Sequence, residues 1–147
     1  MKIIILGAGQ VGASVAENLV SEANDITLVD TSAEHLAMLR DRLEVRTVCG
    51  NAASPKVLRE AGADDADLLI AVTQSDQTNL CACRIAKAVF NLPTRIARLR
   101  STDYVDHPEL LNDHHSAVDF SLCPEQFVTD YIKRLIAFPE ELQVPEF

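Results

Sequence analysis

The chain has 147 residues, of which 48% are hydrophobic and 24% charged, and its formal net charge is −9. This balance is typical of a single soluble globular domain and excludes a disordered chain. The negative charge would repel a polyphosphate backbone, so we expect no nucleic acid partner. No apolar run approaches the roughly 20 residues of a membrane-spanning helix, and the first residues reach glycine too early for a signal peptide. We expect a cytoplasmic protein.

Short aliphatic runs alternate with segments of helical periodicity along the whole chain. The pattern predicts strands at residues 2–6, 26–30, 45–48, 68–72 and 94–99, and near 117–120. It predicts helices at 11–22, 32–42, 54–62 and 76–90, a short one after 108, and a last one from 124. Ser32 is suited to cap the second helix, and Pro55 to occupy the first position of the third.

Strands that alternate with helices over short connections indicate a Rossmann-like fold. We therefore expect an α/β domain with a doubly wound parallel sheet of about six strands and helices on both faces. The last helix carries Phe127, Tyr131, Leu135 and Phe138 along one side. Prolines near the end indicate that the chain leaves the domain there. We expect a domain at residues 1–138 and an exit tail at 139–147.

The junction between the first strand and first helix reads Gly7-Ala8-Gly9-Gln10-Val11-Gly12. Gly7 would permit the tight turn, Gly9 has no Cβ to block a pyrophosphate, and Gly12 lets the helix lie close to the strand. Backbone N–H groups at the start of that helix would point at phosphates. The alternative interpretation is that these glycines only build a tight turn.

Asp30 ends the second strand, where its carboxylate can accept both hydrogen bonds of a ribose diol. The same carboxylate would repel a 2′-phosphate, so we expect NAD(H) as the ligand in preference to NADP(H). A basic residue immediately after Asp30 could relieve the repulsion, but Thr31-Ser32-Ala33 contains none.

The ends of the later strands predict the rest of the site, because ligands of doubly wound sheets bind at the carboxyl ends of the strands. Cys49-Gly50-Asn51-Ala52 could line an adenine, and Thr73-Gln74-Ser75-Asp76 could meet the pyrophosphate or the second ribose. Arg98 and Arg100 share one face of the fifth strand, and each could reach a phosphate. Ordinary polar loop ends remain the alternative for all of these segments.

The four cysteines are Cys49, Cys81, Cys83 and Cys123. They form no C-x-x-C pair, and no histidine lies at a zinc-like offset from them. We expect reduced, buried thiols and no metal site. A redox switch in Cys81-Ala82-Cys83 is the alternative.

Several segments, in their order and spacing, resemble the KTN or RCK family, which includes the N-terminal domain of TrkA from bacterial Trk potassium uptake. They are residues 3–12, 28–30, 60–67 and 71–79, and the resemblance continues through 95–100, 124–126 and 134–136. It covers essentially the whole chain.

The resemblance implies a nucleotide-sensing regulatory subunit of a Trk-type potassium uptake system, peripheral at the inner face of the membrane. The implied ligand is NAD(H), with ATP and ADP as further candidates, held by Gly7 to Val11, Asp30, Thr73, Gln74 and Arg98. The implied partners are the membrane subunit of the transporter and further copies of the chain, as a dimer building toward a ring. Contact between copies would run through a last helix that crosses to a neighbouring subunit, and gating through rearrangement of the subunits.

A small NAD-dependent oxidoreductase is the alternative function. Hydride transfer needs an acid or base beside a substrate pocket. Neither Tyr104 nor Tyr131 belongs to a Tyr-x-x-x-Lys pair, and no nucleophile elbow is present. We therefore expect no catalytic residues and a regulator instead of an enzyme.

Overall fold

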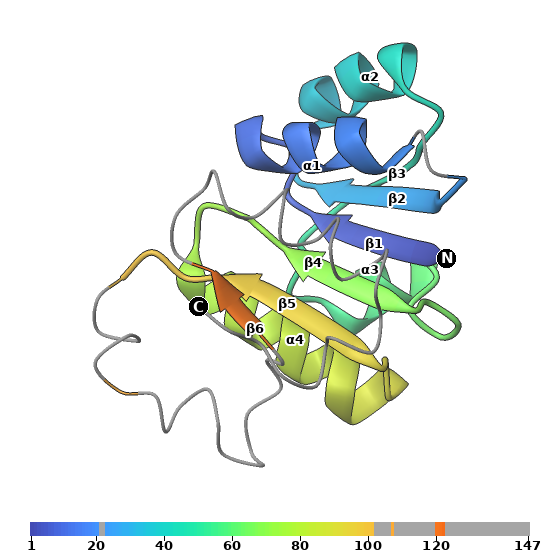
Figure 1. The fold of residues 1–147 in the computed structure, drawn as a ribbon. Coiled ribbons are helices and arrows are strands. Elements are labelled where there is room, and N and C mark those ends of the chain that lie inside the picture. The colour runs from blue at the N-terminus through green and yellow to red at the C-terminus, as the bar shows by residue number, and fades with distance from the viewer. Residues whose placement is uncertain (21–22, 102–106, 108–119, 123–147) are drawn as a thin grey trace.

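Residues 1–20, 23–101, 107 and 120–122 are described in the computed structural model. One sheet of six parallel strands forms the centre, in the order β3-β2-β1-β4-β5-β6 (Figure 1). The strands are β1 (Lys2–Leu6), β2 (Asp25–Asp30), β3 (Arg46–Cys49), β4 (Leu68–Ala71), β5 (Thr94–Arg98) and β6 (Phe120–Leu122). The helices are α1 (Gln10–Val20), α2 (Ala33–Arg42), α3 (Pro55–Glu60) and α4 (Asp76–Phe90).

The strand order reverses between β1 and β4. The chain begins in the middle of the sheet, runs outward to β3, returns to β4 beside β1, and continues outward to β6. Loops that leave β1 and β4 therefore turn to opposite faces and leave a crevice between them at the carboxyl ends of the strands.

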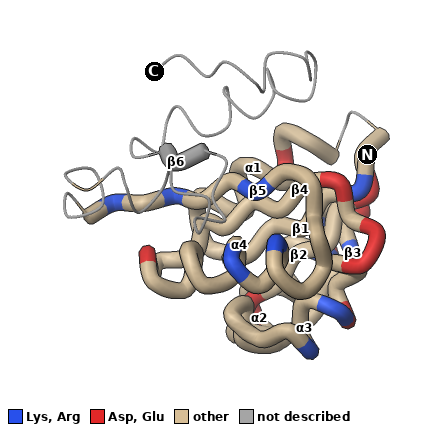
Figure 2. Tube along the Cα trace, turned by 90° about the horizontal axis from the view of Figure 1, so that it is seen from below, with Lys and Arg blue, Asp and Glu red and all other residues tan. Residues whose placement is uncertain are grey.

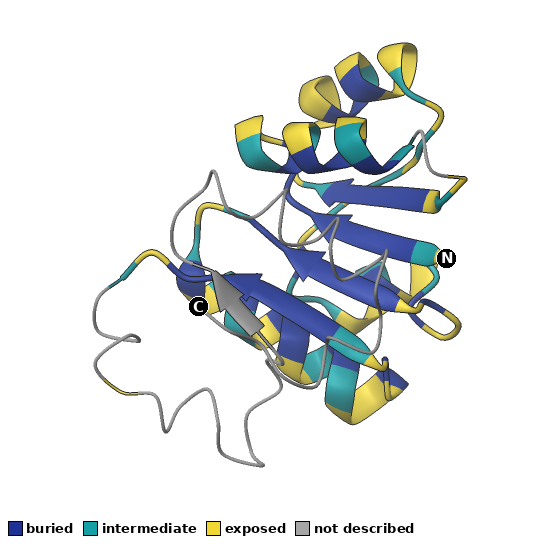
Figure 3. Cartoon of the chain, viewed as in Figure 1, coloured by how far each residue is buried: buried dark blue, intermediate teal, exposed yellow. Residues whose placement is uncertain are grey.

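Both faces of the sheet are covered, as the continuous aliphatic strands require. Ile3 and Ile5 pack on the face covered by α1 and α2, whereas Ile4 and Leu6 pack on the face covered by α3 and α4. The central strands are buried along nearly their whole length (Figure 3). β4 carries no charged residue, whereas the loop that leads into it contains Asp64, Asp65 and Asp67 (Figure 2).

Serine side chains begin three of the helices. The Oγ atoms of Ser32, Ser54 and Ser75 accept backbone N–H groups of the first turns of α2, α3 and α4, at 3.2, 3.4 and 3.1 Å. Pro55 occupies the start of α3, where its missing N–H has no cost. The predicted cap of α2 and the predicted position of Pro55 in α3 are thus confirmed, while capping by Ser54 and Ser75 was not predicted.

The described elements agree with the predicted ones to within about two residues at most boundaries, as expected of pattern-based assignment. The sixth strand was expected near 117–120, and its described part is Phe120–Leu122. The short helix after Pro108, the last helix with its crossover, and the boundary at 138/139 lie outside the described residues. In the part of the chain that is described, no helix is long and apolar enough to cross a membrane.

The expectation of buried cysteines is wrong for two of the four. Cys83 is buried against the sheet, but Cys81 is exposed because it points away from that side of α4. Cys49 is exposed at the end of β3, which is the edge strand of the described sheet beside β2. Cys123 lies outside the described residues.

Candidate functional site

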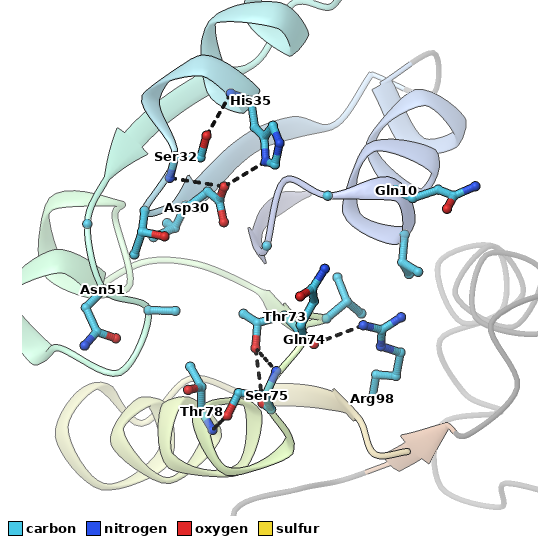
Figure 4. Close-up of a pocket in the computed structure, with 18 of the residues that line it drawn as sticks. Gln10, Asp30, Ser32, His35, Asn51, Thr73, Gln74, Ser75, Thr78 and Arg98 are labelled. Carbon is cyan, nitrogen blue, oxygen red and sulfur yellow. Dashed lines mark hydrogen bonds and ion pairs between the residues drawn. The ribbon is translucent and has the colours of Figure 1, made fainter. Parts of the chain in front are cut away.

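A pocket of about 530 Å³ opens at the carboxyl ends of the strands, at the reversal of strand order (Figure 4). It brings together most of the residues predicted from the sequence. Those in its lining are Gly7, Gly9, Gln10, Val11, Asp30, Thr31, Gly50, Asn51, Ala52, Thr73, Gln74, Ser75, Arg98 and Arg100. Ala8 and Gly12 are buried and do not line it.

The three glycines of the turn between β1 and α1 have different surroundings, which explain why glycine stands at each position. Gly7 has a φ of +108°, and a Cβ there would lie 2.9 Å from the carbonyl oxygen of Val72. A Cβ on Gly12 would overlap the carbonyl oxygen of Gly7. A Cβ on Gly9 would meet no atom within 4 Å. Packing therefore explains Gly7 and Gly12 but not Gly9, which borders the open space of the pocket.

The amino end of α1 gives the pocket a local positive potential. The helix begins at Gln10, and Ala13 N–H donates to the Gly9 carbonyl at 2.9 Å as the first turn closes. The first N–H groups of a helix have no acceptor within the helix, and its dipole is positive at this end. The first turn of α1 contains no acidic residue. An anion is therefore favoured here despite the negative net charge of the chain.

Asp30 lies in the pocket wall at the end of β2, and its side chain is 20% exposed. Its Oδ2 accepts the backbone N–H of Ser32 at 3.3 Å and lies 3.4 Å from Nδ1 of His35. His35 was not predicted from the sequence. Its signal was present, since His35 follows the Ser32 cap by three residues and so falls in the first turn of α2.

Asn79 joins the ends of β4 and β5 from a fully buried position on α4. Its Oδ1 accepts the N–H and the hydroxyl of Thr73 at 2.9 and 2.7 Å. Its Nδ2 donates to the carbonyls of Thr73 and Arg98 at 3.2 and 2.8 Å. The buried Arg98 side chain donates from Nη2 to the same Thr73 carbonyl at 3.0 Å. This network holds the Thr73 loop against β5.

A second set of contacts continues from β5 into the following residues. Arg100 donates from Nη2 to the Gln74 carbonyl at 2.6 Å. The carboxylate of Asp76, in the first turn of α4, accepts the backbone N–H of Arg100 at 3.0 Å and that of Ser101 at 2.8 Å. Both arginines predicted as phosphate contacts are therefore held at the mouth of the pocket by backbone carbonyls.

Several lining residues were not predicted as ligand contacts. They are Val29, Ser32, His35, Val72 and Thr78. Val29, Ser32 and Val72 adjoin a predicted residue in sequence, whereas His35 and Thr78 lie in the first turns of α2 and α4. Among the described residues, no group of three or more histidine, cysteine, aspartate or glutamate side chains could hold a metal ion.

The strand order, the glycine turn and the pocket at the reversal point define a Rossmann-like domain. The sequence model of the TrkA-N domain matches residues 3–115. The chain belongs to the TrkA-N domain family.

Over its whole length the chain is 54% identical to the Trk system potassium uptake protein TrkA of Haemophilus influenzae, of which it covers 32%. It is 53% identical to the protein of the same name from Vibrio alginolyticus, again covering 32%. The chain therefore spans about a third of the length of these relatives.

Solved structures with the same fold include the TrkA-N domain of the inner membrane protein ybaL from Escherichia coli. The TM-score is 0.73 at 23% identity, over 92% of this chain and 96% of that one. The GsuK channel bound to NAD has a TM-score of 0.68 at 16% identity, over 82% of this chain and 21% of that one. Reductases share the fold at TM-scores of 0.67 and 0.69, so the fold alone does not separate a sensor from an enzyme.

Proposed function

We propose that this chain is a cytoplasmic, nucleotide-sensing regulatory part of a Trk-type potassium uptake system, and that NAD(H) is its ligand. One observation carries the proposal. Gly9 borders open space between Asp30 on one side of the pocket and Arg98 on the other, in a turn where the other two glycines are required by packing. A pyrophosphate with a ribose on each side fits that arrangement of groups.

Different residues of the pocket would contact different parts of the ligand. Asp30 would accept the hydroxyls of the adenosine ribose, and Asn51-Ala52 would lie along the adenine. The N–H groups at the start of α1, above Gly9, would bind the pyrophosphate. Thr73, Gln74 and Arg98 would contact the remaining half. ATP and ADP share the adenosine and phosphates with NAD(H), so they are candidates for the same subsites.

Regulation would act through the β4–β5 end of the pocket. A ligand phosphate beside Arg98 would compete with the Thr73 carbonyl that Arg98 now contacts at 3.0 Å. β5 continues directly into Arg100 and Ser101, which Asp76 anchors. We propose that movement of Arg98 toward the ligand displaces the end of β5 and so changes the angle between subunits of a homo-oligomer. This oligomer would be a dimer building toward a ring. The membrane subunit of the transporter, at the inner face of the membrane, would respond to it.

Such a switch requires that the ligand binds two arrangements of the subunits with different affinity. The relatives named for Trk potassium uptake, and the channel bound to NAD, support this proposal. Small-angle scattering of the assembled protein with and without NADH tests it. A change in the scattering profile is expected, and identical profiles at saturation would count against gating by subunit rearrangement.

We propose that the chain is not an enzyme. The titratable side chains among the described lining residues are Asp30, His35, Arg98 and Arg100. Asp30 and His35 contact each other at the end assigned to the adenosine ribose, away from a reacting nicotinamide. An acid or base is therefore not placed for hydride transfer. Sustained NADH oxidation in the presence of a small carbonyl substrate would overturn this part of the proposal.

The experiment that tests ligand binding is a side-by-side calorimetric titration of the protein with NADH, NAD, ATP and ADP. NADH or NAD should bind with a dissociation constant well below about 1 mM, the weak end of specific binding. Absence of heat for all four ligands at that concentration would leave a domain without a nucleotide site. A preference for ATP over NADH would mean that the site is a nucleotide site whose ligand is ATP instead of NAD(H).

A further inference from the structure

His35 has a defined place at the edge of the pocket. Its backbone N–H donates to Oγ of Ser32, the residue that caps α2, at 3.2 Å. This bond fixes His35 in the first turn of the helix, and its side chain lines the pocket while 55% exposed. Figure 4 shows the imidazole of α2 and the carboxylate of β2 pointing toward each other.

The imidazole contacts the group that would select the ligand. Nδ1 of His35 lies 3.4 Å from Oδ2 of Asp30, and the same oxygen accepts the Ser32 N–H at 3.3 Å. Asp30 is therefore held from the α2 side by a backbone N–H and by a side chain whose charge can change. Histidine is the residue type that ordinarily gains or loses a proton between about pH 5 and pH 8.

The two charge states of His35 have opposite consequences at the ribose. With a neutral imidazole, the carboxylate presents its full negative charge and repels a phosphate on the 2′ oxygen. With a protonated imidazole, the pair is neutral overall, and a charged N–H donor stands beside the 2′ position. Charge-assisted bonds from such donors are among the stronger contacts to phosphate.

We infer that His35 is a specificity-determining residue, and that its protonation allows the adenosine ribose subsite to accept a 2′-phosphate. Discrimination against NADP(H) therefore relaxes as the pH falls. This inference rests on the proposed function, because it takes Asp30 to be the ribose contact.

The charged groups around His35 are few. Asp30 contacts it from β2, and Glu34 precedes it in the first turn of α2. Arg98 and Arg100 lie across the pocket at the end of β5. The first turn of α1 contains no acidic residue, and the described lining residues that follow β3 are uncharged. Asp30 is thus the carboxylate of the described pocket lining that His35 contacts.

The test compares NADH with NADPH by calorimetric titration of the full chain at about pH 8 and about pH 5.5, the range in which histidine changes charge. The measured quantity is the ratio of the two dissociation constants, which removes pH effects common to both ligands. The variant His35→Gln keeps a polar side chain without the charge. It also controls for the 2′-phosphate itself, which gains a proton near about pH 6. His35→Lys carries the charge at both pH values.

In the unmodified chain, the preference for NADH over NADPH should fall about fivefold more between the two pH values than in His35→Gln. This is the size of a good ion pair between exposed groups. His35→Lys should already show the weaker preference at the higher pH. If NADH binds, but its preference over NADPH responds to pH equally in the unmodified chain and in His35→Gln, the inference is overturned and the proposed function stands. Failure of NADH and NADPH to bind at either pH would overturn both.

Discussion

The two sides of the pocket are built in different ways. The locked side comprises Thr73, Asp76, Asn79, Arg98 and Arg100. The open side comprises Gly9, Asp30 and His35. Hydrogen bonds hold the locked side around Asn79 and Arg98, which are almost inaccessible to solvent, and they continue to the exposed Arg100. The open side consists of Gly9, where a Cβ would meet no atom within 4 Å, and of the contact between Asp30 and His35, whose side chains reach solvent.

This difference separates residues that maintain the shape of the site, of which Thr73 and Arg98 would also contact the ligand, from residues whose main role would be binding. A satisfied buried network sets one geometry and is costly to disturb. Groups on the open side make few contacts with the rest of the chain, so their substitution should alter binding more than folding. The predictions below test this division, from the largest expected effect to the smallest.

The sharpest test lies within the first turn, where two glycines should behave oppositely. Gly12→Ala should lower the free energy of unfolding by about 3 to 4 kcal/mol, because the new Cβ would overlap the Gly7 carbonyl and the backbone must move. Gly9→Ala should change it by no more than about 0.5 kcal/mol, the usual range for an unpacked site. Urea unfolding monitored by circular dichroism measures both.

NADH titration of Gly9→Ala completes that test. The methyl group would occupy the space assigned to the pyrophosphate, so affinity should fall at least about tenfold, or about 1.4 kcal/mol. Normal NADH binding by a stable Gly9→Ala protein would mean that the open space above this glycine is not the phosphate site.

Asn79 is the corresponding test of the locked side. Asn79→Ala should lower the free energy of unfolding by about 2 to 3 kcal/mol, because buried groups of Thr73 and Arg98 lose their partners. Asn18→Ala is the matched control: its side-chain amide also lies on a helix and donates to the Ser14 carbonyl in an exposed position. Equal stability of the two variants would show that the network does not lock this side.

Much of the fold could be predicted from the sequence because its signals are local. Ile3 to Leu6 form an unbroken aliphatic run, and such runs mark strands covered on both faces. Gly7 and Gly12 stand at the spacing that a tight strand-to-helix turn requires. Boundaries were less certain because strand ends depend on the neighbouring strand: β3 follows the register of β2, with Asp30 opposite Cys49.

The site was predicted only where its residues follow a strand directly. Asp30 and Thr73 follow this rule, since each stands at or just beyond the end of a strand. Asn79 was missed as a site residue because its partner at Arg98 lies across the fold. Asp76 was predicted only as part of the segment after the fourth strand, and its contacts with Arg100 and Ser101 were not expected. His35 was missed because the search for a basic residue stopped at Ala33, although the first turn of a helix returns the chain toward the end of the preceding strand.

Asp30 should show that the open side affects binding more than stability. Asp30→Ala should weaken NADH binding by about 1 to 3 kcal/mol through loss of hydrogen bonds between ribose and a charged acceptor. The free energy of unfolding of this variant should fall by less than its free energy of NADH binding. Asp25→Ala is the control, because Asp25 is exposed at the opposite end of the same strand. Calorimetry on both variants measures the difference, and unchanged NADH affinity in Asp30→Ala would remove this residue from the site.

The smallest effect is expected at Asp76, where the locked side meets the exit of β5. Asp76→Asn should lower the free energy of unfolding by about 1 kcal/mol, because a carboxamide replaces one acceptor oxygen with a donor that cannot receive the N–H of Arg100 or Ser101. Glu34→Gln controls for loss of an acidic residue at the start of a helix, since Glu34 is exposed in the first turn of α2.

The NADH affinity of Asp76→Asn then decides what the Asp76 anchor does. An affinity close to that of the unmodified chain would mean that Asp76 only holds the backbone after β5. A loss as large as that of Asp30→Ala would contradict the division into two sides, because a residue behind the pocket would then matter as much as one inside it. We expect the smaller effect on affinity. When Asp76 is changed, Arg98 retains its hydrogen bond to the Thr73 carbonyl, and its own carbonyl still accepts the Asn79 amide.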